Sequence, residues 1–186
     1  MYIKKINKVI IMCLILCFVF TVKGNAGLDE SVRDFVRRTD EGFLDDSMSF
    51  ISSTGDRDVI LTGLAIMPNG DFRTDLIMAL AAGQLVTESV KWTTGRTRPR
   101  TGKNEFKPFS GHMSFPSGHA TGAFSIATVI ADYYPEYKVY AYIWAGLVAV
   151  SRMYEDAHWF TDVAVGSAVG HFTARKTLGL NWSWEW

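Results

Sequence analysis

Three short stretches decide what this chain folds into and which chemistry it is equipped for: KWTTGRTRP (residues 91–99), PSGH (residues 116–119) and SRMYEDAHWFTD (residues 151–162). Together they supply a lysine, several arginines, two histidines and an acid that can orient one of the histidines. Such side chains can bind a phosphate-like anion and attack it without a metal ion. Each stretch alone is weak evidence for such an anion site, but the three stretches in this order are strong evidence for it.

The third stretch contains a candidate nucleophile. His158 and Asp162 are four residues apart, which predicts that they share one face of a helix over residues 157–178. The carboxylate can accept the proton of one ring nitrogen and leave the other as a nucleophile. Arg152 precedes a bend that can bring its guanidinium to the histidine, where it can bind phosphate oxygens. An ordinary pair on a helix surface is the competing interpretation.

The PSGH stretch stands where a helix over residues 117–134 is expected to begin, with Ser117 as its candidate cap. Free backbone N–H groups and the positive end of the helix dipole form an anion site there. Gly118 lets the backbone approach an oxyanion. His119 is placed to give a proton to a leaving alcohol. A plain serine-capped turn is the competing interpretation.

The first stretch provides cations around a turn. Lys91 and Arg98 flank this turn, so both can point to the same anion. Arg96 and Arg100 are additional cations, which we expect to face solvent or to bind the rest of the substrate.

Length and hydrophobic patterning predict the fold class. The chain has 186 residues, 48% of them hydrophobic, which is enough for the core of one domain. Apolar residues recur at helical spacing and no stretch alternates as a strand does, so we expect an all-α, single-domain bundle of about five to six helices. The expected helices cover residues 28–51 (broken near Asp45-Asp46), 59–67, 71–92, 117–134, 137–153 and 157–178. Residues 93–116 are expected to form a long loop.

The N-terminal residues 1–26 have the pattern of a signal peptide. Lysines precede an apolar run over residues 9–22, and small residues follow up to Ala26, after which we expect cleavage. An uncleaved anchor is the alternative. Both cysteines, Cys13 and Cys17, lie in the apolar run, so we expect no disulfide in the domain of residues 27–186. The protein is therefore expected outside the cytoplasm, in the periplasm or on the outer face of the cytoplasmic membrane.

The three stretches together resemble the type 2 phosphatidic acid phosphatase superfamily, which also contains bacterial class A acid phosphatases and vanadium haloperoxidases. The pattern is a lysine six residues before Arg-Pro, then Pro-Ser-Gly-His, then Ser-Arg, five residues, His, three residues and Asp, and every position is present. The resemblance implies an all-α bundle with the active site at one end. It implies His158 as nucleophile, Asp162 as its partner and His119 as general acid. The phosphate-binding residues that it implies are Lys91, Arg98, Ser117, Gly118 and Arg152.

The leading interpretation is a metal-independent phosphatase that forms a phosphohistidine and needs no cofactor, with vanadate as an inhibitor. A vanadate-dependent haloperoxidase, in which vanadate is the cofactor, and a non-catalytic anion-binding envelope protein are the alternatives. In the leading interpretation, the expected substrate is a phosphate monoester or a lipid-linked phosphate or diphosphate. A formal net charge of +0 argues against a nucleic-acid partner.

Hydropathy bears on the expected location of this protein. The expected helices are short and semi-polar, which favours a secreted, soluble or membrane-surface form over a deeply embedded one. Tyr154, Trp159, Phe115 and the loop over residues 102–109 are the residues expected to shape the substrate pocket.

Overall fold

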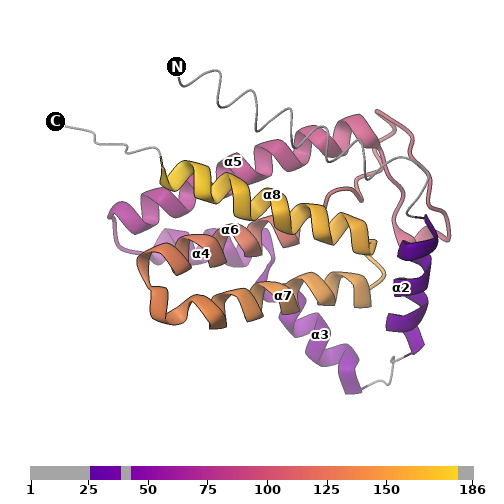
Figure 1. Cartoon of the computed structure of the whole chain (residues 1–186), viewed down its shortest axis with the longest axis horizontal. Coiled ribbons are helices and arrows are strands. Elements are labelled where there is room, and N and C mark those ends of the chain that lie inside the picture. Colours follow the sequence, from indigo (N-terminus) through magenta and orange to yellow (C-terminus); the bar gives the residue numbers. More distant parts are fainter. Residues whose placement is uncertain (1–25, 39–42, 180–186) are drawn as a thin grey trace.

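The computed structural model describes residues 26–38 and 43–179, which form an all-α bundle (Figure 1). The helices are α2 (Ala26–Arg38), α3 (Phe43–Thr54), α4 (Arg57–Ile66), α5 (Asp71–Thr94), α6 (Gly118–Tyr133), α7 (Lys138–Tyr154) and α8 (Phe160–Leu178). Two short 3-10 turns, Pro99–Thr101 and Pro135–Tyr137, complete the described elements. The all-α prediction is confirmed, with slightly more helices than expected. The predicted signal peptide, apart from Ala26, and both cysteines lie outside the described residues.

Two of the predicted helix boundaries are wrong. The break expected near Asp45 and Asp46 does not occur there, because both residues lie in the first turn of α3. Carboxylates are favourable in a first turn because the N-terminal end of a helix carries partial positive charge. The last helix begins at Phe160 rather than near residue 157, so His158 lies in the turn before α8 and not on its face.

Helix α6 is the centre of the bundle, with α5, α7 and α8 packed around it (Figure 1). Small residues allow α8 to approach α6 closely. A Cβ atom at Gly166 would lie 2.4 Å from the Ser117 carbonyl oxygen, and one at Gly170 would lie 2.2 Å from that of Thr121. Any larger residue would therefore push the two helices apart. This close contact holds the N-terminal end of α6 beside that of α8.

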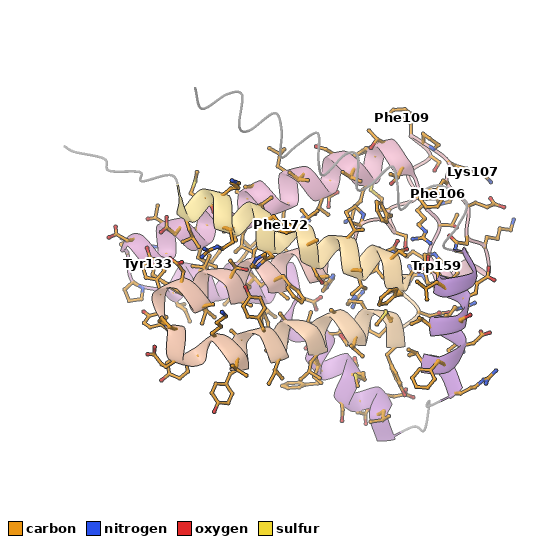
Figure 2. The ribbon with its side chains drawn as sticks, viewed as in Figure 1. Phe106, Lys107, Phe109, Tyr133, Trp159 and Phe172 are labelled. Carbon is orange, nitrogen blue, oxygen red and sulfur yellow. The ribbon has the colours of Figure 1, made fainter. Side chains whose placement is uncertain are left out.

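The loop between α5 and α6 is anchored at its first residue. Gly95 ends α5 in the left-handed conformation, with φ of 56°, and its N–H donates to the Lys91 carbonyl. A Cβ atom here would lie 1.7 Å from the Lys107 carbonyl oxygen, so this position requires glycine for two reasons. The loop packs over the end of the bundle at which α2 stands. Figure 2 places Trp159 and Phe106 at this end, and Tyr133 at the opposite end.

Several helices expose apolar side chains. On α7 the exposed residues follow one face of the helix: Val139, Tyr140, Ile143, Leu147 and Val150. Over the described ranges, however, every helix falls short of the combined length and apolarity that a membrane span needs.

Candidate active site

One cavity of about 810 Å³ collects most of the predicted site residues. Its polar side is lined by Lys91, Arg98, Gly118, His119, Arg152 and His158. These residues come from the end of α5, the loop after it, the start of α6, the end of α7 and the turn before α8. Residues from five separate segments thus meet at one end of the bundle. The cavity does not include Ser117 and Asp162, which are buried behind it.

His158 presents one ring nitrogen to Asp162. Its Nδ1 atom lies 3.5 Å from the Asp162 Oδ2 atom, and both side chains are buried. Because Nδ1 faces the carboxylate, we place the proton on Nδ1, and the Nε2 atom then carries a lone pair. Burial, together with the charges of Arg98 and Arg152, lowers the pKa of His158, although Asp162 opposes this. The lowered pKa favours the neutral imidazole, whose Nε2 lone pair is then available.

Asp162 lies in the first turn of α8 and is held on several sides. Its Oδ2 atom accepts hydrogen bonds from Ser114 Oγ at 2.5 Å and from the Trp159 backbone N–H at 2.9 Å. Its Oδ1 atom accepts from Arg96 at 2.5 Å. Burial raises the pKa of Asp162, but the nearby His158 ring and the Arg96 charge outweigh burial, so the pKa is lowered. The carboxylate stays ionised beside the histidine.

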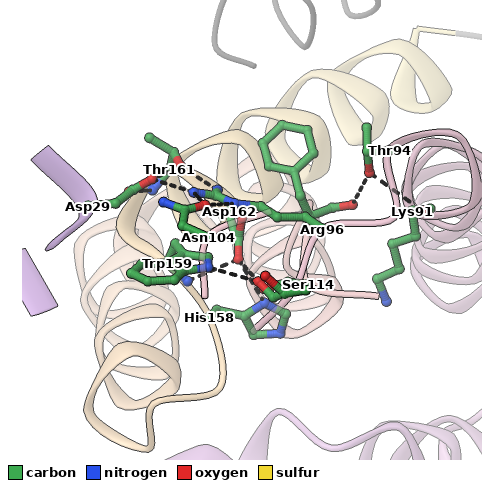
Figure 3. Close-up of polar contacts among 12 residues, drawn as sticks. Asp29, Lys91, Thr94, Arg96, Asn104, Ser114, His158, Trp159, Thr161 and Asp162 are labelled. Atoms are coloured by element: carbon green, nitrogen blue, oxygen red, sulfur yellow. Dashed lines mark hydrogen bonds and ion pairs between the residues drawn. The ribbon is translucent and has the colours of Figure 1, made fainter. Parts of the chain in front are cut away.

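Arg96 corrects a sequence-based prediction. It was expected to face solvent or substrate, yet its side chain is only 3% exposed. The guanidinium forms ion pairs with Asp162 and Asp29, and it donates to Thr161 and Asn104 as well (Figure 3). The aromatic ring of Trp159 lies 5.4 Å from the guanidinium carbon. Arg96 is therefore part of the support behind the active site. Arg100, by contrast, is exposed as expected.

Two cations of the cavity are paired with nearby acids. Lys91 Nζ lies 2.9 Å from Glu88, and Arg152 donates to Glu155 at 2.6 Å and to the Ser52 hydroxyl. Both acids sit three residues from their partner and are more exposed than it, so an incoming phosphate can compete for the cations.

Arg98 is half-buried at the edge of the cavity. Its pKa is lowered by burial and by the charges of Arg100 and Arg152, so an anion bound in the cavity would relieve the repulsion among these cations.

His119 is paired with a carboxylate from outside the three motifs. Its Nε2 atom lies 2.8 Å from Asp56 Oδ1, at the residue before α4. Burial and the charge of Arg152 lower the pKa of His119, while Asp56 opposes this. Asp56 is about half exposed, so the pair remains accessible from the cavity that both residues line. The site therefore contains two histidine–carboxylate pairs, one buried and one open.

Ser117 and Gly118 shape the start of α6. The Ser117 hydroxyl accepts a hydrogen bond from the Ala120 N–H, so this side chain caps the helix instead of lining the cavity. Gly118 lines the cavity, and a Cβ atom there would lie 3.3 Å from Lys91 Nζ. Because glycine has no side chain, Lys91 can lie close to the N-terminal end of α6, where backbone N–H groups favour an anion.

The walls of the cavity differ from the sequence-based prediction. Trp159 and Phe115 are buried in the core, and neither they nor residues 102–109 line the cavity. The opposite wall comes instead from α4 and the middle of α5. Its apolar residues are Val59, Ile60, Leu61, Leu64, Ile77, Leu80 and Ala81.

Sequence reasoning missed three acids and amides that complete the site: Asp29, Asp56 and Asn104. Each is distant in sequence from the residue that it supports or lies in an irregular loop. Local spacing carries no signal for such contacts. Asp56 had one weak signal, since it follows a glycine and precedes a helix.

Comparison with known proteins identifies the family of this chain. The model of the PAP2 superfamily matches residues 73–186. A phosphatidylglycerophosphatase B of Bacillus subtilis is 30% identical over 162 residues, which are 76% of this chain and 77% of that protein. A lipid A 1-phosphatase of Porphyromonas gingivalis is 37% identical over 98 residues, 50% of this chain and 20% of the relative. The chain thus spans only a minor part of the lipid A 1-phosphatases that it matches.

A solved structure agrees on the fold. The transmembrane PAP2-type phosphatidylglycerolphosphate phosphatase of Bacillus subtilis superposes with a TM-score of 0.73 at 20% sequence identity, covering 94% of each chain. The three motifs, the bundle that joins them and the match over residues 73–186 lead to one conclusion: the chain belongs to the PAP2 superfamily.

Proposed function

We propose that this protein is a metal-independent lipid phosphatase that works through a phosphohistidine on His158. The observation that carries the proposal is the cavity itself. It joins a cationic end, with Lys91, Arg98 and Arg152, to an apolar wall built by α4 and α5. A phosphate group fits the first part and a hydrocarbon chain fits the second.

In the first step, the lone pair of His158 Nε2 forms a bond to phosphorus as the bond from phosphorus to the leaving oxygen breaks. His119 gives its proton to that oxygen, so the product leaves as a neutral alcohol. The positive charge that develops on the His158 ring is stabilised by Asp162, which faces Nδ1. Lys91, Arg98 and Arg152 stabilise the charge on the remaining phosphate oxygens.

In the second step, water attacks the phosphohistidine. His119, now neutral, takes a proton from this water, and the nitrogen–phosphorus bond breaks to release inorganic phosphate. Both histidines return to their starting protonation states. Asp56, 2.8 Å from His119, supports the proton-carrying form of that ring. The sequence leaves soluble and lipid substrates open, and the apolar wall favours the lipid.

The relatives and the surface support the same substrate class. The matched relatives are named for lipid substrates, lipid A and phosphatidylglycerophosphate. The exposed apolar face of α7 suits contact with a membrane surface. We therefore propose an exported enzyme on the outer face of the cytoplasmic membrane, acting on the phosphate monoester or diphosphate of a lipid.

The test uses the full-length chain in mild detergent with EDTA present. We expect phosphate release from phosphatidic acid or phosphatidylglycerophosphate in mixed micelles, and none from His158→Ala. His112→Ala is the matched control, because His112 lies on the exposed part of the loop. Activity that survives in His158→Ala, or that EDTA abolishes, contradicts the mechanism.

A second pair of variants tests the substrate class. Leu61 lines the cavity and is 54% exposed, so Leu61→Asn removes apolar wall with little expected cost to folding. We expect KM for the lipid to rise about tenfold, because a hydrocarbon chain that covers the exposed part of this leucine gains about 1.5 kcal/mol of binding free energy. Hydrolysis of a water-soluble chromogenic monoester should not change. Ile66→Asn, on the same helix but outside the cavity, is the control, and equal effects on both substrates contradict a lipid groove.

A further inference from the structure

Helix α2 contributes a buried acid to the support of the active site. Asp29 is 1% exposed, and it lies on α2, outside residues 73–186 that match the family model. Its Oδ2 atom is 2.5 Å from Arg96 and accepts from the Thr161 hydroxyl at 2.8 Å. Its Oδ1 atom accepts from the Thr161 backbone N–H at 2.9 Å. One carboxylate thus holds both Arg96 and the first turn of α8.

Arg96 connects this acid to the nucleophile. Its two terminal nitrogens point to different acids, one to Asp29 and the other to Asp162, each at 2.5 Å (Figure 3). Asp162 in turn faces His158. The order of contacts is therefore Asp29, Arg96, Asp162 and His158, and the first three of these side chains are buried away from the cavity.

The net negative charge of this cluster suits the proposed reaction, because it offsets the positive charge that develops on His158. Two carboxylates and one guanidinium give one net negative charge next to a neutral imidazole. When His158 attacks phosphorus, its ring becomes cationic and the total becomes zero. Without the charge of Asp29, the cluster would start neutral and become positive, which a buried site disfavours.

We propose that Asp29 is a positioning residue for the phosphatase reaction, and that it acts through Arg96 to keep Asp162 aligned with His158 and effective against its developing charge. The inference rests on the proposed function of His158. It also assigns a task to α2, which closes the active site from behind. A second anchor fixes this helix, because Arg33 forms a two-pronged ion pair with Asp156 at 2.7 and 2.6 Å.

The decisive experiment compares three variants on α2 in the full-length chain. Asp29→Asn keeps the shape of the side chain but removes its charge. Glu30→Gln removes the same charge from the neighbouring, exposed position. Arg33→Gln weakens the second anchor of α2 without touching Arg96. We expect kcat of Asp29→Asn to fall about tenfold with little change in KM, as for other outer supports of an active site, and both controls to keep kcat within about twofold.

The pH profile separates electrostatic positioning from loss of structure. His158 faces Asp162, Arg98, Arg152 and His119. Removing the charge of Asp29 leaves Arg96 less neutralised, which disfavours the imidazolium and lowers the pKa of His158. The acid limb of kcat/KM should therefore move to lower pH in Asp29→Asn, whereas partial unfolding would lower activity at every pH without moving the limb.

Two further measurements keep the test decisive. The chain has four histidines, so a titration of ¹⁵N-histidine-labelled protein can follow His158 by NMR without any substrate. That titration separates failure of this inference from failure of the proposed phosphatase activity. If Asp29→Asn does not fold, Thr161→Val removes the hydroxyl shared by Asp29 and Arg96 while leaving both charges, and its kcat should fall severalfold. Unchanged kcat and an unmoved His158 titration in the folded variant would overturn the proposal.

Discussion

Replacing Asp162 by asparagine removes one buried negative charge with almost no change in volume. The Asp162 Oδ2 atom lies 3.5 Å from His158 Nδ1, on the ring that becomes cationic when Nε2 attacks phosphorus. At an effective dielectric constant of about 20, opposite unit charges at this separation attract by about 5 kcal/mol. Since about 1.4 kcal/mol corresponds to a tenfold change in rate, we expect kcat of Asp162→Asn to fall by about 10³-fold.

The assay measures kcat on a lipid phosphate in mixed micelles, with His158→Ala as the lower limit. Ser114→Ala is the matched control, because it removes one hydrogen bond to the same carboxylate and leaves the charge in place. We expect its kcat to fall much less than that of Asp162→Asn. Thermal unfolding should show that both variants are folded at the assay temperature, since Arg96 keeps Asp29 as a charged partner.

Two results would refute this reasoning. One is an Asp162→Asn enzyme that retains kcat within tenfold of the wild type. The other is a Ser114→Ala enzyme that loses as much activity as Asp162→Asn, because the hydrogen bond, not the charge, would then carry the effect.

The remaining predictions concern the proton donor, the cations, the helix packing and an inhibitor. Burial and the charge of Arg152 lower the pKa of His119, whereas Asp56 opposes this shift, and the proposed first step needs this ring protonated. Asp56→Asn should therefore move the alkaline limb of kcat/KM to lower pH and reduce activity above neutral pH by up to about fivefold, the limit for a half-exposed pair of about 1 kcal/mol; a limb that moves upward contradicts the role of Asp56. Arg152→Ala should reduce kcat by about 10² to 10³, as loss of one oxyanion donor does, and a loss below tenfold in a phosphate-release assay would exclude this role. Gly166→Ala places a Cβ atom 2.4 Å from the Ser117 carbonyl oxygen, so thermal unfolding should show a lower Tm, with a loss of about 1–3 kcal/mol; an unchanged Tm would mean that α6 and α8 are less tightly packed than described. Orthovanadate should inhibit phosphate release competitively, and vanadate-supported bromination with peroxide would instead favour the haloperoxidase alternative.

The contact between His158 and Asp162 shows how a correct prediction can rest on a different local cause. The spacing of four residues predicted one helical face, yet α8 begins at Phe160. Asp162 instead folds back within the first turn of α8 and accepts from the Trp159 backbone N–H. The side chains meet as expected because both geometries bring residues four apart close together.

Two arginines of the first stretch show where sequence reasoning stops. Arg96 and Arg98 are two residues apart in a loop of irregular conformation; the motif spacing assigns Arg98 to the anion, but nothing in the local sequence indicates that Arg96 is buried. The left-handed turn at Gly95 and the bridge between Arg96 and Phe106 direct Arg96 into the core. Arg98 then reaches the cavity. Arg96 is buried because it pairs with two acids, Asp29 and Asp162, which come from helices distant in sequence. Only the packing of those helices therefore decides which cation is buried.

The sequence by itself determined the fold class and the family of this protein: an all-α chain with two histidines, an acid and three cations in the order of the PAP2 superfamily. It could do so because the phosphate chemistry proposed for this site requires particular side chains, and local motifs place most of them. The tertiary structure alone decided the apolar wall of the cavity, the partner of His119 and the buried cluster behind His158. These features depend on contacts between α2, α4 and the rest of the bundle, and the free energy of such long-range packing leaves no pattern in the local sequence.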